Sequence, residues 1–318
     1  MYALGIDGGG SRTRALLCDA YGQIIGQGLG RGTNPRTSSA AELKAHLQEA
    51  IEQATRSIDC SKIIAAHFGL AGAGDADTRA KVRRITKEPL GKQTACTIGH
   101  DLEIALAGGL ANKTGIVLVA GTGSACYGRT CDGRSAKCGD GGDLVDEVGS
   151  GSWIGLRALQ ACVSQTDGRL TESPLKQAVM GFLKIDHMNT FKARIHDSGL
   201  SRSERARLAP IILNLASAGD AASIAIVAEG VGSLSNCVFS TSRQLGITAP
   251  SVLLSGGLLK HTYFSNSLEA ALKARIPSAI ITQPILSPTA GAVLMALKAI
   301  NCEISDDNID KLKEASYS

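Results

Sequence analysis

In the first 112 residues, short apolar runs alternate with longer stretches that carry apolar residues three or four positions apart. The runs predict buried strands, and the periodic stretches predict helices that bury one face. Strands are expected over residues 2–6, 14–18, 23–28, 63–70 and 94–98, and helices over 40–57, 75–87 and 102–110, with Ser38 or Ser39 as the first N-cap. The predicted order is therefore β-β-β-α-β-α-β-α.

The pattern restarts at residue 116 with two further strands, over 116–120 and 125–129, on either side of a glycine-rich turn. From Trp153 onward the periodicity is helical, including a long regular stretch at 221–245. The remaining predicted elements are strands over 251–254 and 279–282 and helices over 258–274 and 289–300. Two halves that each begin with a hairpin favour two similar α/β domains that face one ligand cleft.

The composition is that of an ordinary globular protein, since 44% of the 318 residues are hydrophobic and 19% are charged. The 33 basic and 29 acidic residues are spread along the chain and aromatic residues amount to only 3%, so we expect no nucleic-acid partner. The first apolar segment breaks at Asp7 and no run of 18 apolar residues occurs, so neither a signal peptide nor a membrane span is expected. A cytoplasmic protein is predicted.

The nine cysteines, an odd number, are better explained as reduced thiols than as a disulfide framework. Cys126, Cys131 and Cys138 lie close together in the sequence, but their irregular spacing lacks the Cys-x-x-Cys or histidine partners of a metal site. We therefore expect no structural zinc.

A run of three glycines, Gly8–Gly10, connects the first two predicted strands. Backbone N–H groups in such a turn can cradle phosphate oxygens, and Ser11 and Thr13 add hydroxyl donors. Asp7, at the end of the first strand, could hold the divalent cation of a nucleotide, directly or through water. The same residues also describe a tight hairpin without a ligand. Because the glycines open a hairpin and not a helix, neither a P-loop nor a Rossmann domain is indicated.

Five separated segments, by their order and spacing, resemble one family: residues 7–13, the turn 32–34, Asp101 at a helix start, 120–124 and 255–257. This family is the N-acetylglucosamine kinase and BadF/BadG ATPase group, within the sugar kinase, Hsp70 and actin superfamily. The resemblance implies an α/β protein with two ribonuclease-H-like (actin-like ATPase) domains around a central nucleotide cleft. It places the first domain at residues 1–112, joined by the C-terminal helix 293–318, and the second, with a helical insertion, at 113–292.

The resemblance assigns the phosphates of ATP to two loops and the adenosine to two further segments. The phosphate-binding residues would be Gly9, Gly10, Ser11, Thr13, Gly121, Thr122 and Gly123, the adenosine-binding residues Gly256, Gly257, Ala290 and Gly291, and Asp7 would hold Mg²⁺, directly or through water. Without the resemblance, the two adenosine segments can also be explained as a strand-to-helix turn and as a site of helix packing.

Asp101 matches the family's catalytic aspartate, which would act as general base on the sugar hydroxyl that attacks the γ-phosphorus. The alternative is a helix N-cap, a position that Asp favours for backbone reasons alone. Asn34, which precedes Pro35, matches a sugar contact of the family but is also an ordinary turn former. The implied sugar-binding residues are Asn34, Ala71, Gly72, Asp101, Thr122, Gly139, Asp140, Asp146 and Glu147.

Residues 138–151 depart from the family pattern, which is Cys-Gly-Gly-Trp-Gly followed by Leu-Gly-Asp-Glu-Gly-Ser-Gly. An ungapped match puts Gly141 in the position of the Trp and Glu147 in that of the sugar-binding Asp, whereas a shift of one residue restores Asp146 to that role. The sugar pocket has therefore lost its aromatic wall. The carboxylates of this loop either favour a free amine, as in glucosamine, or form a solvated acidic loop, so both amino sugars stay open.

The resemblance thus implies an ATP-dependent amino-sugar kinase that uses Mg²⁺ and transfers the γ-phosphoryl group to the 6-hydroxyl of N-acetylglucosamine or glucosamine. One alternative is the ATPase activator of an acyl-CoA dehydratase, which carries an iron–sulfur cluster. We expect no such cluster, because Asn34 and Asp101 would then be unexplained. The other alternative is a non-catalytic sugar or nucleotide sensor, which is disfavoured because no helix-turn-helix extension precedes residue 2. A homodimer stays open.

Overall fold

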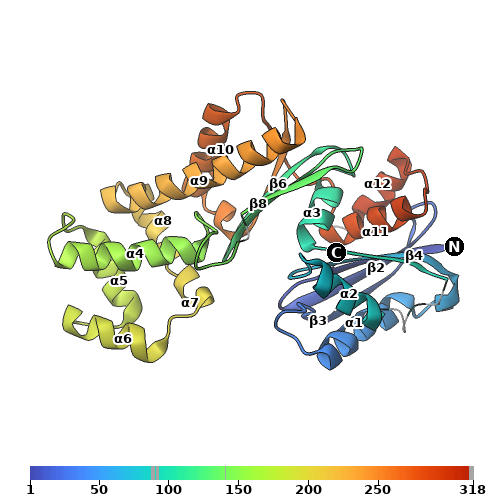
Figure 1. Cartoon of the computed structure of the whole chain (residues 1–318), viewed down its shortest axis with the longest axis horizontal. Helices are drawn as coiled ribbons and strands as arrows, with labels where there is room; N and C mark the ends of the chain where they lie inside the picture. The colour runs from blue at the N-terminus through green and yellow to red at the C-terminus, as the bar shows by residue number, and fades with distance from the viewer. Residues whose placement is uncertain (87–89, 91–92, 140, 315–318) are drawn as a thin grey trace. The chain divides into compact units, whose positions relative to one another are not determined.

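The structure is a computed structural model, and it describes residues 1–86, 90, 93–139 and 141–314. The chain divides into two compact units, which are drawn in Figure 1. Unit 1 comprises Met1–Thr114, Thr130–Asp132 and Gln283–Ser318, and unit 2 comprises Gly115–Arg129 and Gly133–Thr282. The C-terminal segment therefore belongs to the same unit as the N-terminus.

Unit 1 is built on a sheet of five strands: β1 (Tyr2–Gly8), β2 (Arg12–Asp19), β3 (Ile24–Arg31), β4 (Ile63–Leu70) and β5 (Ala95–Gly99). Their spatial order is β3-β2-β1-β4-β5. The first three strands form an antiparallel meander, and β4 and β5 run parallel to β1. Side chains of β1 alternate between the two faces, so that Leu4 and Ile6 enter one apolar cluster and Ala3 enters another.

Helices cover both faces of this sheet. They are α1 (Ala40–Thr55), η1 (Cys60–Lys62), α2 (Ala76–Thr86), α3 (Asp101–Gly109), α11 (Pro288–Ala299) and α12 (Asp306–Glu314). On one face α1 buries Leu43, Leu47 and Ile51, and it begins at a capping box between Ser39 and Glu42. On the other face α11 lies along β1 and beside α3 (Figure 1).

Unit 2 repeats the sheet topology of unit 1. Its strands are β6 (Gly115–Ala120), β7 (Ser124–Arg129), β8 (Ser135–Gly139), β9 (Ser251–Ser255) and β10 (Ile280–Thr282). The order is β10-β9-β6-β7-β8, in which β6, β7 and β8 are antiparallel neighbours and β9 and β10 run parallel to β6. Each unit therefore begins with a hairpin whose turn lies at the same end as the carboxyl ends of its parallel strands.

One large apolar core joins the helices of unit 2 to its sheet. The helices are α4 (Gly151–Thr166), α5 (Pro174–Leu183), η2 (Met188–Thr190), α6 (Phe191–Ser198), α7 (Arg202–Ala206), α8 (Ala209–Ser217), α9 (Ala221–Leu245), η3 (Gly257–Lys260) and α10 (Thr262–Arg275). By length and composition alone α9 could cross a membrane. Its Val227, Leu234 and Val238 are buried in this core, however, so we interpret α9 as a core helix.

The α/β order predicted from the sequence is confirmed, but three details were wrong or missing. β8 was not predicted, because it is a short strand that pairs only with β7. The helix expected over 258–274 is interrupted at His261, which separates η3 from α10. Residues 293–318 do not form one helix, since α11 ends at Ala299 and the separate α12 begins at Asp306.

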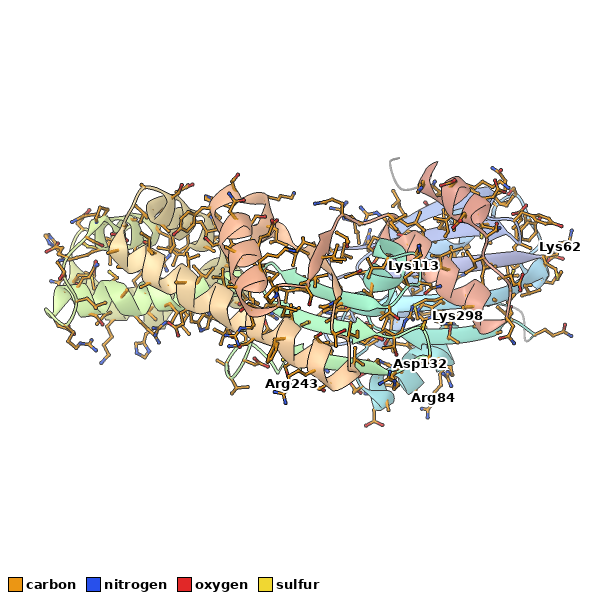
Figure 2. The ribbon with its side chains drawn as sticks, turned by 90° about the horizontal axis from the view of Figure 1, so that it is seen from above. Lys62, Arg84, Lys113, Asp132, Arg243 and Lys298 are labelled. Atoms are coloured by element: carbon orange, nitrogen blue, oxygen red, sulfur yellow. The ribbon has the colours of Figure 1, made fainter. Side chains whose placement is uncertain are left out.

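Long charged side chains extend from the surfaces of both units, as Figure 2 shows. In unit 1, the exposed Lys62, Arg84 and Lys298 come from η1, α2 and α11, respectively. In unit 2, the exposed Arg243 comes from α9. The labelled basic side chains thus come from different elements, in agreement with the dispersed charge of the sequence.

Candidate active site

Three parallel strands of unit 1 end at the same edge of the sheet, and residues singled out in the sequence lie there. Gly8 of β1 is opposite Leu70 of β4, and Gly69 of β4 is opposite Gly99 of β5. Asp7, Ala71 and Asp101 occupy or directly follow these strand ends. Open α/β sheets bind their ligands at the carboxyl ends of parallel strands, so this edge is the candidate site of unit 1.

Asp7 is the charged group at the end of β1. Burial raises its pKa to about 6, while the nearby Arg14 cation lowers the pKa and the charge of Asp101 raises it. The Arg14 Nη1 lies 3.8 Å from Asp7 Oδ2. Within the described ranges, no three His, Cys, Asp or Glu side chains gather as they do around a metal ion held by protein ligands. Mg²⁺ usually takes one or two carboxylates and completes its shell with water and phosphate oxygens. A single carboxylate beside the glycine turn is compatible with that habit, and the Mg²⁺ role of Asp7 stays a prediction.

In the glycine turn between β1 and β2, one backbone amide closes the hairpin and two others remain available to a ligand. The Gly9 N–H donates to the Arg12 carbonyl at 2.9 Å and so closes the hairpin. The amides of Gly10 and Ser11 have no acceptor in the part of the chain that the structure describes. Both residues are exposed, and a Cβ added to Gly10 would meet no atom within 4 Å. Gly9 thus shapes the turn, and the amides of Gly10 and Ser11 are the donors that an anion can reach.

Thr13 uses its hydroxyl for hydrogen bonds within the protein. Its side chain is fully buried, and its Oγ1 donates to the Arg31 carbonyl at 2.6 Å and lies 2.8 Å from Thr33 Oγ1. The Thr13 side chain faces inward because positions of β2 alternate between the two faces of the sheet. Its hydroxyl has protein partners, and phosphate binding by Thr13 stays a prediction. Thr13 links β2 by hydrogen bonds to the end of β3 and to the turn at Thr33.

The predicted sugar residues Asn34, Ala71 and Gly72 are brought together at the same edge. The Ala71 N–H donates to the Gly8 carbonyl at 2.8 Å, and the Thr33 N–H donates to the Gly9 carbonyl at 2.9 Å. A side chain at Gly72 would overlap Asn34 Oδ1, and Gly72 has φ +85°, which favours glycine. Asn34 Oδ1 also accepts from the Arg36 N–H at 2.9 Å, as in an Asx turn. Asn34 is thus both a turn former and a neighbour of Gly72.

Asp101 is the first residue of α3, and the N-cap of this helix is His100. Asp101 is therefore not the N-cap, but its Oδ1 accepts from the Leu102 N–H at 3.1 Å in the first turn of the helix. Glu103 organises the junction, because its Oε1 lies 3.2 Å from His100 Nε2 and accepts from Arg79 Nη2 at 3.1 Å. Arg79 also donates from Nε to the Ala73 carbonyl at 2.9 Å. This network ties the turn after β4 to the start of α3, where the Asp101 carboxylate lies.

The second predicted phosphate loop connects β6 and β7 in unit 2. Gly121 donates its N–H to the Gly123 carbonyl at 2.8 Å, and its own carbonyl accepts from the Gly151 N–H at 2.7 Å. The Thr122 carbonyl accepts from the Ser152 N–H at 3.1 Å, so the loop is fixed to the start of α4. The amides of Thr122 and Gly123 have no acceptor among the described residues. This loop, like that of unit 1, keeps two amides for a ligand.

Of the predicted adenosine residues, two adjoin this loop and the other two belong to unit 1. Gly256 has φ +115° and packs so closely on Ala120 that a side chain there would overlap the Ala120 carbonyl. The Gly257 N lies 3.7 Å from the place where a Cβ of Gly121 would stand. Ala290 is fully buried in unit 1, and a side chain at Gly291 would overlap the Ile104 carbonyl. Close packing of α11 on α3 accounts for both residues without a ligand, and the adenosine role of Ala290 and Gly291 stays a prediction.

The acidic loop after β8 contains carboxylates with different surroundings. Asp140 lies outside the described residues, and Gly139, at the end of β8, has φ +77°. Asp146 Oδ2 accepts from the Gly141 N–H at 3.0 Å and so closes a turn within the loop. Glu147 is only 4% exposed, and a side chain at Gly123 would collide with its carboxylate. Of the two candidates for the sugar-binding acid, Glu147 is thus the one that adjoins the phosphate loop.

Two arginines of α7 pair with this loop, and the sequence prediction missed both. Arg202 pairs with Glu147, and Arg205 pairs with Asp143, which also accepts from Ser152 Oγ at 2.5 Å. Burial raises the pKa of Asp143, but the hydrogen bonds from Ser152 and Arg205 and the charges of both arginines lower it overall. Asp143 and Glu147 are therefore not a solvated acidic surface. Only the Ser201–Glu204 capping box of α7 was visible in the sequence, and it says nothing of partners.

Comparison with known proteins places the whole chain in one group. The model of the BadF/BadG/BcrA/BcrD ATPase family matches residues 4–296. An N-acetylmuramic acid/N-acetylglucosamine kinase from Clostridium acetobutylicum is 29% identical over 303 residues, which cover 93% of this chain and 98% of the relative. An N-acetyl-D-glucosamine kinase from Dictyostelium discoideum is 25% identical over 311 residues, with the same coverage.

A solved structure agrees with the sequence comparisons. It comes from Chromobacterium violaceum, was provisionally assigned as an N-acetylglucosamine kinase, and is 25% identical to this chain with a TM-score of 0.69. The match covers 93% of this chain and 98% of that one. Both five-stranded units therefore have counterparts in a single known architecture, as the fold prediction required.

Proposed function

The chain belongs to the BadF/BadG/BcrA/BcrD ATPase family, and on this premise we propose that it is an ATP-dependent amino-sugar kinase. The reaction transfers the γ-phosphoryl group to the 6-hydroxyl of N-acetylglucosamine or glucosamine, so the enzyme is a phosphotransferase with an alcohol acceptor. One observation carries this proposal: the strand ends of unit 1 bring Asp101, Asn34 and Gly72 to the edge that holds the glycine turn, two of whose amides have no acceptor among the described residues. Relatives that are named as kinases of N-acetylated amino sugars support the same class of acceptor.

Asp101 is the proposed general base. A sugar hydroxyl that attacks the γ-phosphorus must lose its proton, and a carboxylate within hydrogen-bond reach can orient this hydroxyl and accept the proton. The Asp101 carboxylate lies at the start of a helix, where the backbone dipole stabilises its ionised form. Asn34, Ala71 and Gly72 would hold the sugar, the last two through backbone groups.

Both loops are proposed to bind the phosphates of ATP. The amides of Gly10 and Ser11 in unit 1 and of Thr122 and Gly123 in unit 2 supply the donors, and Gly256 and Gly257 would border the adenosine. Asp7 would hold Mg²⁺ through water or directly. When bound, Mg²⁺ neutralises charge on the phosphate oxygens.

For the acceptor, the structure favours the N-acetylated sugar over the free amine. A cluster of unpaired carboxylates would attract an ammonium group, but Arg202 and Arg205 already compensate Glu147 and Asp143. Glu147 is proposed to accept a hydrogen bond from the sugar.

Because the substrates are ATP and a small sugar, we also propose that the protein acts in the cytoplasm. A homodimer remains a prediction.

The test is ADP release with Mg-ATP against N-acetylglucosamine, glucosamine, N-acetylmuramic acid, glucose and no sugar. We expect release that depends on N-acetylglucosamine, with the product phosphorylated at the 6-position by NMR. Asp101→Asn should lower turnover at least about 100-fold while ATP still binds, whereas Asp167→Asn, at an exposed ion pair with Arg169, should behave like the wild type. ADP release that is indifferent to sugar would point to an activator-type ATPase, and no release with any sugar to a sensor. Near-normal turnover of Asp101→Asn would remove Asp101 from the role of base.

A further inference from the structure

The guanidinium group of Arg202 lies directly against the second phosphate loop. A side chain at Gly123 would overlap Arg202 Nη2, so the arginine occupies the space that the glycine leaves open. Both residues belong to unit 2, where α7 carries Arg202 and the β6–β7 turn carries Gly123. No feature of the sequence pointed to this neighbourhood.

Arg202 pairs with carboxylates but stays partly exposed. Its partner Glu147 has a side chain that is 5% exposed, whereas the side chain of Arg202 is 45% exposed. A second carboxylate, Asp143, lies 3.9 Å from Arg202 Nε. A guanidinium has five N–H donors in a planar fork, so the contact with Glu147 leaves donors that face solvent. Arg202 is thus a cation fixed in position, and part of its guanidinium group remains open to solvent.

The backbone at Glu147 shows that its position is not accidental. Glu147 has φ +60°, in the left-handed region, which costs a residue with a side chain about 1–2 kcal/mol. The Glu147 carboxylate is also almost fully buried, so it needs a charged partner to offset the cost of its desolvation. The strained backbone is explained if the Glu147 carboxylate must reach a defined place, and that place is beside Gly123 and Arg202.

The contacts of the loop indicate which part of a nucleotide Arg202 would meet. The loop is a tight turn, since Ala120 pairs with Ser124 and the Gly121 N–H donates to the Gly123 carbonyl at 2.8 Å. Arg202 lies at Gly123. It is therefore beside the amides of Thr122 and Gly123, which are proposed above to bind the phosphates.

We propose that Arg202 contacts the β- and γ-phosphates of the bound nucleotide, with Glu147 as the residue that positions its guanidinium over Gly123. An arginine fork suits phosphate oxygens geometrically and stabilises the charge that develops on them during transfer. This inference rests on the nucleotide site of the proposed function, but not on the identity of the sugar.

The experiment compares the affinities of the full-length protein for AMP and for a non-hydrolysable ATP analogue by calorimetry, without sugar. Arg202→Ala should weaken binding of the analogue about 10- to 100-fold and leave AMP affinity within about twofold. Arg202→Lys keeps the charge but loses the planar guanidinium group. Its affinity for the ATP analogue should lie between those of the wild type and Arg202→Ala. The matched control is Arg207→Ala, which removes an arginine that stacks on Phe182 at 5.9 Å, and both affinities should stay unchanged.

The outcomes separate the two proposals. Equal losses for AMP and the analogue, in variants that melt like the wild type, would make Arg202 a structural partner of Glu147 and overturn the inference. Unchanged affinity for both ligands would overturn it too. If Arg202→Ala weakens binding of the analogue but not of AMP, and the wild type phosphorylates no amino sugar, the acceptor assignment fails and the role of Arg202 stands. If the wild type binds neither ligand, both proposals are wrong.

Discussion

The Asp7 carboxylate lies where its charge is unfavourable in the free protein and would be favourable beside a bound cation. Burial raises its pKa from an ordinary value near 3.8 to about 6. The folded protein therefore binds a proton more tightly than the unfolded chain, and ionisation of Asp7 destabilises the fold above pH 6. This destabilisation is lost as the pH falls through 6 toward 4. A group that is costly in the absence of its ligand is common at binding sites.

Asp7→Asn should therefore make the protein more stable and less active. At pH 7.5, in EDTA and without nucleotide, we expect the free energy of unfolding to rise by about 2–3 kcal/mol. At pH 4 the gain should nearly vanish, because Asp7 is then protonated in the folded wild type. Urea unfolding of both proteins at the two pH values measures this difference. An equal gain at both pH values would show that the charge of Asp7 is not its cause.

Glu103 is a positioning residue for Asp101. It bridges Arg79 and His100, so its removal frees the start of α3 without touching the Asp101 carboxylate. We expect Glu103→Ala to lower kcat about 10- to 100-fold and to change KM for ATP less than threefold, because misplacement of a catalytic group by about 1 Å has such an effect. Glu103→Gln, which can still accept from Arg79, should recover part of kcat.

Steady-state kinetics of Glu229→Ala provide the comparison for Glu103. Glu229 also pairs with an arginine, Arg157, at 3.0 Å, but its side chain is 52% exposed, and it lies in unit 2. This variant should keep normal kcat. A parallel loss of kcat and of melting temperature in Glu103→Ala, without recovery in Glu103→Gln, would indicate a structural role only.

At the level of single residues, the sequence predicted those parts of the site that follow directly from local turns. Gly10 and Ser11 lie in the turn that the glycine run indicates, and Asp101 lies at a predicted helix start. Arg202 could not be found in this way, since it reaches Glu147 across 55 positions of the chain. The burial of Thr13 could not be predicted, because the face of β2 on which a threonine lies depends on strand register.

Elements with strong periodicity and clear ends were predicted best. The bounds of α9 agree with the predicted 221–245, because Asp220 caps its start and Gly246, with φ +70°, ends it. β8 carries no such signal, since it has five residues and one neighbouring strand. The contact between α3 and α11 could not be predicted either, because it joins segments that lie far apart in the sequence.

This contact gives a prediction at the scale of the element. A methyl group at Gly291 would overlap the Ile104 carbonyl and meet the backbone of Gly108, so Gly291→Ala should force α11 away from α3. We expect a loss of stability of about 1–3 kcal/mol. Gly181→Ala in α5 is the matched control, since a Cβ there would meet no atom within 4 Å. It should stabilise the protein by up to about 1 kcal/mol, because alanine suits a helix better than glycine.

Chemical unfolding followed by circular dichroism distinguishes the two glycine variants. Opposite signs for Gly291→Ala and Gly181→Ala would support the role of Gly291 in helix packing. If Gly291→Ala instead left stability unchanged but reduced ATP affinity, the result would support the prediction that α11 contacts the adenosine.

At the scale of the whole molecule, the two units share a sheet topology without an obvious repeat in sequence. Each unit places a hairpin turn at the carboxyl end of its parallel strands, and each turn keeps two amides without an acceptor among the described residues. The hairpin-first order of both halves was visible in the sequence, because apolar strands and glycine turns are local signals. The correspondence of the two turns suggests a shared task, the binding of phosphate oxygens.

Hydrogen exchange tests whether both turns bind the same nucleotide. Amides without an acceptor exchange rapidly, so peptides that cover Gly10–Ser11 and Thr122–Gly123 should exchange fast in the free protein. A non-hydrolysable ATP analogue with Mg²⁺ should slow both peptides, whereas AMP, which lacks the outer phosphates, should slow them less. A peptide from α5 serves as internal control and should not change. Slowing at the turn of unit 1 alone would mean that the loop at 121–123 is not a phosphate loop, and the proposed role of Arg202 would then fail with it.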